Sequence, residues 1–364
     1  MTEHSIFRKE TRAAVAASSA VYERHPYFIR NYSRCRELLL TEKDPEGAAE
    51  AVRFGIMHAR LLHLDCYLLP IVYIDWMLPE LLKDLKKQGI PDTVIMESLR
   101  DIEIWIQSYR KYHQGQVGLD RIEWVFRSLA GKVQRFGSLQ FEKVTYEFPF
   151  LVLENRQSGK LQAMAYPDLV ADQDGYFAGT NARKSVSIVK TELEYQEGNL
   201  HGYCADLKRG TLNVEEKASY CLENWEVKLV PGEEAVAVHI PEGADLSPDS
   251  IDASLHAAKS YYENSILICE SWMLDPHLEL ILPQTSRVVN FMHRFYKIPV
   301  MADRPQILER VMGFDFTMDK LLQFPCTTSL QSALKKYLSE GNEMFTTAGF
   351  MPWNDNTTGR NTGL

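Results

Sequence analysis

The chain has 364 residues, a formal net charge of −9 and a pI near 5.7. This acidic balance argues against a general binder of nucleic acid, and the length suggests two domains. The six cysteines form no CxxC pair and no metal-ligand spacing, and the first residues, MTEHSIFRKETRAA, contain no apolar signal segment. We therefore expect a reduced, cytoplasmic chain that holds no metal.

One apolar stretch, LLHLDCYLLPIVYIDWML at residues 61–78, is long enough to cross much of a bilayer if it is helical. Asp65 and Asp75 would each cost about 2.5–3.5 kcal/mol near the bilayer centre. A helix buried inside a helical domain is therefore favoured over a membrane span. The two acids and His63 could form a buried polar site, although capping or pairing within the helical core is the simpler interpretation.

The first third of the chain has helical periodicity. Apolar residues recur every three or four positions after the start signal Pro91-Asp92, at Ile95, Leu99, Ile102, Trp105, Ile106 and Tyr109. Gly89 is expected to end the preceding helix. A third helix follows Gly118, with Gly131 near its end.

From Leu139 the pattern changes to short strands separated by turn residues. The predicted strands are LQFEKVTY, FPFLVLEN, KLQAMAYP, TELEYQ and LHGYCADL. The alternating glutamates of TELEYQE indicate a solvated strand face, with a cation-binding face as the weaker alternative. This middle region is therefore expected to form a sheet.

The segment Ala235–Phe295 is the most informative part of the sequence. A strand, VAVHIPEG, leads into a helix that begins after Ser247, and a second strand, ILICESWMLDP, leads into a second helix. Strands joined through a helix pair in parallel, so the segment predicts a βαβα unit. Reactive side chains gather at the two strand ends: His239, Cys269, Glu270 and Asp275.

The loop and helix start at Val238–Asp249 could present free backbone N–H groups to an anion such as a pyrophosphate. The loop contains one glycine and no lysine or arginine, and its acids Glu242, Asp245 and Asp249 would repel a phosphate. A structural turn with the helix capped by Ser247 is the alternative interpretation.

Three side chains at the strand ends, Glu270, Cys269 and His239, have to be assessed for a catalytic or binding role. Glu270 follows a buried run and could act as a general base with a raised pKa, or could simply point to solvent. Cys269 has no activating partner in the sequence and is interpreted as a small core residue. His239 lies at the carboxyl end of its strand, where open sheets commonly bind ligands, or it is a hydrogen-bonded core histidine.

Several segments together resemble a group of bacterial acyltransferase-like proteins with a helical N-terminal domain and a GNAT-like C-terminal domain. They are GLDRIEWVFRSLAGKVQRFGSLQFE at 118–142, VHIPEGADL, CESWMLDP and LPQTSRVVNFMHRF. Ser138 stands where these proteins commonly have arginine, and Arg287 where they commonly have asparagine. The resemblance covers most of residues 45–300.

The fold class that follows is α+β. We expect a helical N-terminal domain at 1–135, a mixed-sheet GNAT-like α/β domain at 136–352 and a mobile tail at 353–364.

The resemblance implies an N-acyltransferase that moves an acyl group from acyl-CoA, its co-substrate, directly to an amine or hydroxyl acceptor. It places pantetheine along the first strand and pyrophosphate at the following helix, with binding residues Val238, Ile240, Gly243, Ala244, Ser247 and Arg287. Glu270 is the expected base, His239 the second choice, and Tyr296, near the end of the last helix of the unit, the expected acid. The alternative is a non-catalytic ligand-binding or scaffold protein with the acyltransferase fold. Donor and acceptor are small molecules in the first case, and the sequence does not indicate an oligomeric state.

Overall fold

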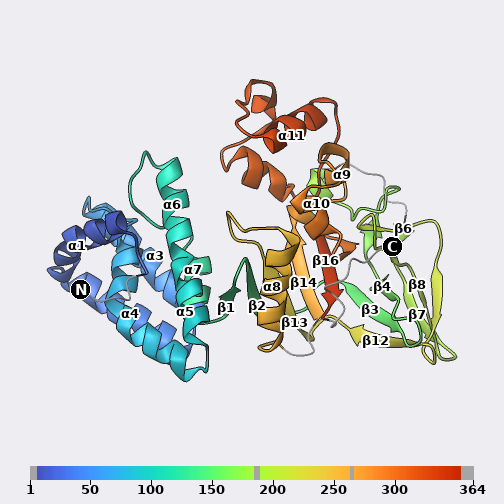
Figure 1. Ribbon diagram of the computed structural model, residues 1–364, viewed down its shortest axis with the longest axis horizontal. Coiled ribbons are helices and arrows are strands. Elements are labelled where there is room, and N and C mark those ends of the chain that lie inside the picture. The colour runs from blue at the N-terminus through green and yellow to red at the C-terminus, as the bar shows by residue number, and fades with distance from the viewer. Residues whose placement is uncertain (1–5, 184–188, 263–265, 354–364) are drawn as a thin grey trace. The chain divides into compact units, whose positions relative to one another are not determined.

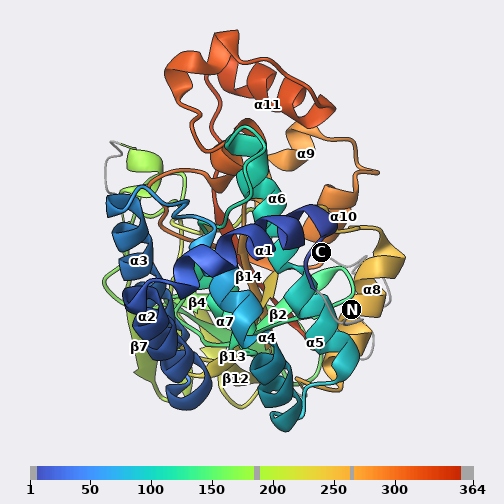
Figure 2. The ribbon, with the colours of Figure 1, turned by 90° about the vertical axis from the view of Figure 1, so that its left-hand side faces the viewer.

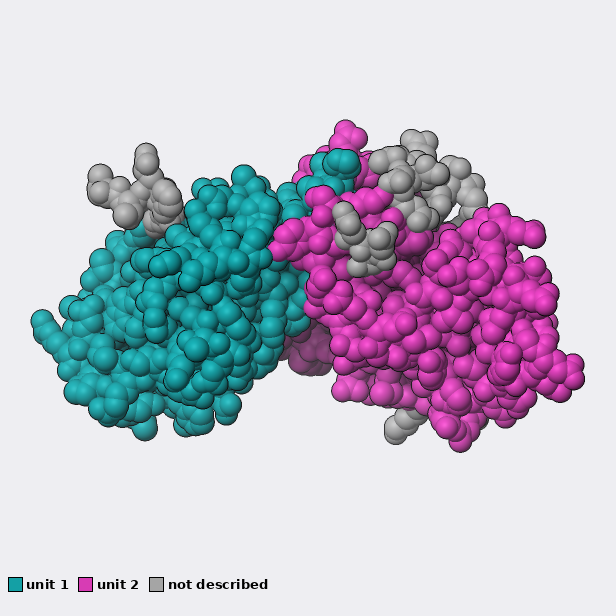
Figure 3. All heavy atoms as spheres, turned by 90° about the horizontal axis from the view of Figure 1, so that it is seen from below, with its two compact units in different colours: residues 1–142, 239–244, 253–258 teal, residues 143–238, 245–252, 259–364 magenta. Residues whose placement is uncertain are grey.

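The computed structural model describes residues 6–183, 189–262 and 266–353. Its contacts divide the chain into two compact units, which Figure 3 colours separately. Unit 1 comprises residues 1–142, 239–244 and 253–258, and unit 2 comprises residues 143–238, 245–252 and 259–364. The predicted mobile tail lies outside the described residues from residue 354 onward.

Unit 1 consists mainly of helices, as the periodicity predicted. They are α1 (Lys9–Glu23), α2 (Pro26–Glu37), η1 (Leu38–Glu42), α3 (Pro45–Leu61), α4 (Leu69–Lys87), α5 (Asp92–Arg100), α6 (Ile102–Tyr112) and α7 (Ile122–Leu129). Helix α3 packs against α2, α4 and α7, and Figure 2, which looks onto this unit, shows α1 running across α4. Gly89 and Gly131 have positive φ angles of 79° and 78° just after α4 and α7, which confirms them as helix stops.

From Leu68 onward the apolar stretch at 61–78 contributes to the core of this unit. Helix α4 begins at Leu69, and its residues Ile71, Tyr73 and Met77 are fully buried. No helix within the described ranges is long and apolar enough to cross a membrane. His63, Asp65 and Asp75 are exposed, so the alternative of a buried polar site at these residues is wrong.

The predicted helix over residues 92–109 is divided in two at Asp101. The Asp101 side chain is buried, pairs with Arg135 and accepts a hydrogen bond from Gln140 Nε2 at 2.6 Å. These partners lie in the hairpin of β1 (Val133–Phe136) and β2 (Leu139–Thr145). The break therefore comes from a tertiary interaction that helical periodicity does not encode.

Unit 2 contains the predicted sheet region. Its strands are β3 (Phe150–Asn155), β4 (Leu161–Ala165), β5 (Val170–Ala171), β6 (Val189–Lys190), β7 (Leu193–Gln196), β8 (Asn199–Gly202), β9 (Ala205–Asp206), β10 (Thr211–Leu212), β11 (Ala218–Cys221), β12 (Trp225–Leu229), β13 (Glu234–His239), β14 (Ile266–Ser271), β15 (Tyr296–Pro299) and β16 (Thr347–Pro352). Small sheets form in the orders β12-β3-β4 and β11-β8-β7. In the sheet that carries the βαβα unit, β13, β14, β16 and β15 are successive neighbours (Figure 1).

The remaining elements of unit 2 are helical. They are η2 (Thr180–Ala182), η3 (Trp272–Leu274), α9 (Leu278–Ile281), α10 (Arg287–Met292), η4 (Leu308–Met312), η5 (Met318–Gln323) and α11 (Ser329–Ser339), and helix α8 (Pro248–Lys259) passes through both units. Figure 1 shows α9, α10 and α11 gathered at one end of unit 2. They enclose an apolar cluster that includes Leu278, Ile307 and Leu334, separate from the cluster under the sheet, which includes Phe150, Ile268 and Phe350.

Candidate active site

The central feature of the βαβα unit is that its two parallel strands pair over a short length. Within the described residues, the parallel pairing of β13 with β14 consists of Val236 opposite Leu267 and Ala237 opposite Ile268. Strand β13 continues to His239 and β14 to Ser271, while β14 stays paired with β16 along its whole length. The pairing is parallel, as predicted, and it stops before the carboxyl ends of both strands, a parting that we call the splay.

His239, at the end of β13, is held by a buried carboxylate. Its Nε2 lies 3.3 Å from Oε2 of Glu142, whose side chain is only 2% exposed. Arg127 binds the same carboxylate through two nitrogens, with Nε 3.0 Å from Oε1 and Nη2 2.6 Å from Oε2. The ring of Trp124 meets the imidazole edge to face, 4.7 Å between centroids. All four residues belong to unit 1.

The charge balance at Glu142 explains why a carboxylate can be buried there. Burial favours the neutral acid, but hydrogen bonds from His239 and Arg127 outweigh it, so the pKa of Glu142 is lowered from its ordinary value. An ionised Glu142 accepts a hydrogen bond from the Nε2–H of His239, so in a neutral ring Nδ1 is the unprotonated nitrogen. The sequence predicted His239 at this strand end. It did not indicate its partners Glu142 and Arg127, because they lie on β2 and α7, far away in the sequence.

Glu270 lies on β14, opposite Ala348 of β16. Its side chain is exposed, and Gln306 Nε2 approaches its Oε1 at 3.5 Å. The surrounding protein removes part of its hydration and raises the pKa of Glu270 above the ordinary value, although the carboxylate keeps contact with solvent. A carboxylate with a raised pKa at a splayed strand has the chemistry of a general base. The neighbouring Cys269 is 2% exposed and burial raises its pKa, as expected of a core cysteine.

The loop after β13 makes a tight turn in which the amide of Ala244 donates to Pro241 O at 3.1 Å and Gly243 has a φ of 77°. Space is open around the position that a Gly243 Cβ would take. Among the other predicted contacts, Val238 is buried on β13 and Ile240 is half-buried just after it. At Gly243, therefore, no side chain stands between the main chain and a ligand.

The start of α8 already carries an anion of the protein itself. Oδ1 of Asp245 accepts the amide of Ser247 at 3.0 Å, and Oδ2 accepts the hydroxyls of Ser247 at 2.9 Å and Ser250 at 2.6 Å. Arg287, at the start of α10, binds Oδ1 at 2.9 Å. The hydrogen bonds from Ser250 and Ser247 lower the pKa of Asp245 to about 2, so the carboxylate is charged at neutral pH. The predicted phosphate-binding residues Ser247 and Arg287 therefore lie close together, but both bind the carboxylate of Asp245.

Tyr296 does not lie on a helix, which corrects the sequence prediction. Helix α10 ends at Met292, and Tyr296 begins β15, where it is opposite Phe350 with the two rings stacked at 5.7 Å. The apolar spacing of Phe291 and Phe295 fits a helix, but the run YKIPV that follows contains strand-forming residues and a proline. Strand pairing with β16 therefore wins over continuation of the helix.

A large groove lies in unit 2 and includes Tyr296 in its wall. Its volume is 1630 Å³, and its wall also contains Tyr176, Asp206, His277 and Phe345. We call this feature the groove. Both apolar and charged side chains line it, which is typical of a site for a polar organic ligand.

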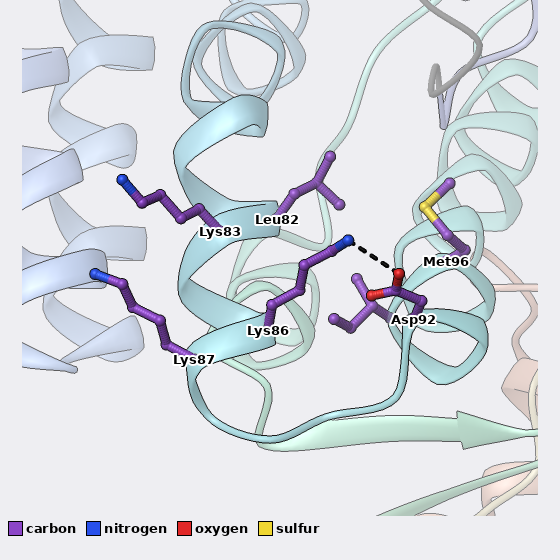
Figure 4. A pocket seen from close by; sticks show the side chains of 7 residues that line it. Leu82, Lys83, Lys86, Lys87, Asp92 and Met96 are labelled. Atoms are coloured by element: carbon purple, nitrogen blue, oxygen red, sulfur yellow. Dashed lines mark hydrogen bonds and ion pairs between the residues drawn. The ribbon is translucent and has the colours of Figure 1, made fainter.

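A smaller hollow of 550 Å³ lies in unit 1 between α4 and α5 (Figure 4). Lys86 binds Asp92 at 2.9 Å across it, while Lys83 and Lys87 point away from that pair. Its floor is apolar and its polar groups do not converge on one point, so it lacks the features of an active site. Across the described ranges, no three His, Cys, Asp or Glu side chains gather in a way that could hold a metal ion.

Comparison with known families decides the identity of the fold. Residues 133–351 match the family described as GNAT-like C-terminal domain, and residues 3–131 match the N-acyltransferase N-terminal domain. The chain belongs to the GNAT-like C-terminal domain family. The α+β class, with a helical N-terminal part followed by a mixed-sheet GNAT-like domain, is thereby confirmed. No curated protein matches the chain.

Solved structures of similar fold are acyltransferases. One is an acyltransferase mutant, orf11*, in complex with octanoyl-CoA, with a TM-score of 0.51 and 19% identity over 79% of this chain and 68% of that one. Another is an acyltransferase in complex with CoA and 10C-teicoplanin, with a TM-score of 0.50 and 19% identity over 80% of this chain and 68% of that one. At 19% identity, this similarity shows that the chains share a fold.

Proposed function

We propose that the protein is an acyl-CoA-dependent N-acyltransferase, which moves an acyl group directly to an amine, or to a hydroxyl, of a small-molecule acceptor. The observation that carries the proposal is the splay of β13 from β14 in a chain of the GNAT-like family. Parted strand ends leave main-chain groups available to an extended ligand, as the amides of a pantetheine chain require. The CoA complexes of the structural neighbours support the same donor.

The proposed donor site uses the main chain of Val238 and Ile240 for pantetheine, and Gly243, Ala244 and Ser247 for pyrophosphate. The N–H groups at the start of α8 favour an anion. Asp245 already accepts one of these N–H groups, that of Ser247, together with the Ser247 hydroxyl, so a pyrophosphate must displace or avoid its carboxylate. Arg287 can then pair with a phosphate, since its present partner is Asp245.

In the proposed reaction the acceptor nitrogen attacks the thioester carbonyl, the C–N bond forms and the C–S bond breaks. Glu270 accepts a proton from the nitrogen and Tyr296 supplies one to the departing thiolate, so no covalent enzyme intermediate is needed. His239 is the second candidate for the base because Glu142 fixes the orientation of its ring.

Since acyl-CoA is made in the cytoplasm, we propose that location for the protein.

The alternative of a non-catalytic ligand-binding protein rests on Asp245. Its carboxylate occupies the start of α8 and neutralises Arg287, so the chain lacks a free cation at the expected phosphate position among the described residues. This arrangement favours a ligand without a phosphate.

Titration calorimetry with acetyl-, octanoyl- and decanoyl-CoA separates the two functions. The enzyme hypothesis predicts that at least one thioester binds, and that an amine mixture then accelerates release of free CoA thiol. The Glu270→Gln variant should keep thioester affinity and lose about 10²–10⁴-fold in that rate, the usual contribution of a general base.

The matched control is Glu223→Gln, a change at an exposed glutamate in a turn of unit 2. It should leave both affinity and rate unchanged. Absence of binding for all three thioesters contradicts the enzyme hypothesis, whereas full activity of Glu270→Gln would move the role of base to His239 and call for His239→Gln.

A further inference from the structure

The groove contains a histidine whose orientation is fixed by a buried acid. Asp275 follows the single turn η3 at the end of β14 and is 0% exposed. Its Oδ1 accepts the amide of His277 at 3.0 Å and the ring Nδ1 at 2.7 Å, and its Oδ2 accepts the amide of Phe345 at 2.6 Å. All these residues belong to unit 2, so the arrangement is independent of the cluster at His239.

This bonding leaves the outer nitrogen of His277 available. The backbone bonds alone would suffice to cap the turn before α9, so the ring bond adds a second function, which is to orient the imidazole. With Nδ1 as donor to Asp275, Nε2 is the basic nitrogen of the neutral ring. The side chain is 28% exposed and lines the groove, and Nε2 has no hydrogen-bond partner in residues 6–183, 189–262 and 266–353.

The charges around His277 suit a proton acceptor that works near neutral pH. Burial lowers the pKa of the ring, but the bond to Asp275 and the charge of Glu343 raise it more, so the pKa lies above its ordinary value of 6.5. The ring centroid of Tyr337 of α11 lies 6.5 Å from that of His277, and the centroid of Phe345 lies 5.3 Å from it. Glu279 of α9 also lines the groove, and its carboxylate is paired with His293.

The wall of the groove also suits a cation. It includes the rings of Tyr176, Tyr296 and Tyr337, and aromatic faces attract organic cations. Tyr176 is stacked on Phe345 and Tyr296 on Phe350, each through one face. The wall carries more carboxylates than cations: the acids are Asp174, Asp206, Glu215, Glu216, Glu279 and Glu343, and the cations are Lys160, Arg183, Lys208 and Arg209. Of these cations, Arg183 is engaged by Asp174 at 2.9 Å and by Glu343 at 3.2 Å. An alkylammonium group therefore meets aromatic faces and carboxylates.

We propose that the groove binds the acceptor of the acyl transfer as an alkylammonium ion, and that His277 Nε2 accepts the ammonium proton. This inference rests on the proposed function. The N–H bond of the ammonium breaks and an N–H bond forms at Nε2, which converts R–NH₃⁺ and neutral imidazole into R–NH₂ and imidazolium. The free amine has the lone pair that attack on a thioester requires, and the imidazolium returns its proton to water in the open groove.

The test uses the full chain with octanoyl-CoA as donor and n-hexylamine as probe acceptor. His277→Asn removes the titrating nitrogen but keeps an N–H at the position of Nδ1, so the bond to Asp275 and the fold can persist. The control is His256→Asn, at an exposed position of α8. We expect His277→Asn to keep its affinity for octanoyl-CoA and to lose about 10²-fold or more in amine-dependent release of CoA thiol, whereas His256→Asn keeps both.

The pH profile distinguishes a proton acceptor from a structural residue. In the wild-type protein the amine-dependent rate should rise as pH increases through a pKa above 6.5, and His277→Asn should lack this step. An unchanged rate and profile in His277→Asn overturns the inference.

A second measurement does not depend on the acyl transfer. In the proton NMR spectrum, hexylammonium should shift the His277 ring signal, identified by its absence in His277→Asn, whereas n-hexanol should not. If octanoyl-CoA fails to bind, the proposed function fails, and a hexylammonium shift would still establish the cation site. Absence of that shift overturns the inference whether or not acyl-CoA binds.

Discussion

Glu142 is the residue that makes His239 a candidate for chemistry and not merely a polar side chain at a strand end. A buried carboxylate that accepts bonds from both Arg127 and His239 fixes the imidazole ring. The sequence predicted His239 because its position at the end of an apolar strand is a local signal. Its partners could not be predicted, since they come from α7 and β2, and a contact across 97 positions leaves no trace in local periodicity.

Lys297 is another buried charged residue, and no local sequence pattern singles it out. It lies on β15 with 4% of its surface exposed. Burial lowers its pKa to about 8, although the charges of Glu279 and Asp206 act in the opposite direction. In the unfolded chain its pKa is the ordinary 10.5, so folding discourages protonation of Lys297.

This shift predicts a pH-dependent stability. Because the folded pKa is the lower one, the cost of burying the charge is fully present below about pH 8 and disappears as the pH rises towards 10.5. Lys297→Met, which keeps the length of the side chain, should therefore raise the free energy of unfolding at pH 7 by about 1–3 kcal/mol, with a smaller gain at pH 10. Urea unfolding at the two pH values measures it.

Lys83→Met is the control for this experiment, since Lys83 is exposed on α4. It should change the free energy of unfolding little and equally at both pH values. A loss of stability in Lys297→Met at pH 7 would show that the ammonium group contributes favourable contacts that exceed its desolvation.

At the scale of elements, the βαβα unit was predictable because each signal lies within a few residues. The strand at VAVHIPEG, the helix start after Ser247 and the parallel strand at ILICES all appear where the sequence placed them. The short α10 and the strand at Tyr296 were not predicted correctly, since pairing with β16 decides that segment. The roles assigned to Glu270, Tyr296 and the loop residues remain predictions.

The start of α8 carries the next prediction. If acyl-CoA binds there, the carboxylate of Asp245 repels the pyrophosphate, and Asp245→Asn should tighten binding of octanoyl-CoA. Charges near a helix terminus typically change affinities by about two- to fivefold at low salt. The gain should shrink as salt rises, because exposed charges are screened. Calorimetry at two salt concentrations measures both effects.

Asp303→Asn, at an exposed position of the loop after β15, controls for the change in net charge. It should leave the affinity unchanged. Weaker binding in Asp245→Asn would indicate instead that Asp245 orders the loop for the ligand, through its bonds to Ser247 and Ser250.

At the scale of the whole molecule, neither unit is a single continuous segment of the chain. Unit 1 needs residues 239–244 and 253–258 in addition to residues 1–142. The later segments supply His239 to Glu142 and the Ser254 hydroxyl, which accepts the amide of Ser138 at 2.8 Å. Helical periodicity revealed the N-terminal part but not these additions, because they come from elements that locally resemble the rest of the βαβα unit.

This composition predicts the behaviour of fragments. Residues 1–142 expressed alone should unfold at a lower temperature than the intact chain, because the buried Glu142 loses a partner and the Ser138 amide loses its acceptor. Co-expression with residues 143–364 should restore a transition near that of the intact chain. Circular dichroism during heating measures this, and an unchanged transition for 1–142 alone would show that the later segments add nothing to its stability.

The short pairing of β13 with β14 has a further consequence for how this protein can change over time. A ligand bound by peptide groups of a strand does not depend on which side chains the strand carries, provided that their bulk stays outside. Substitutions at such positions therefore change the affinity for that ligand little, whereas substitutions in the wall of a cavity change which ligands it can hold. If the strand binds the donor and the groove binds the acceptor as proposed, the acceptor can change in the course of evolution while the same donor is kept.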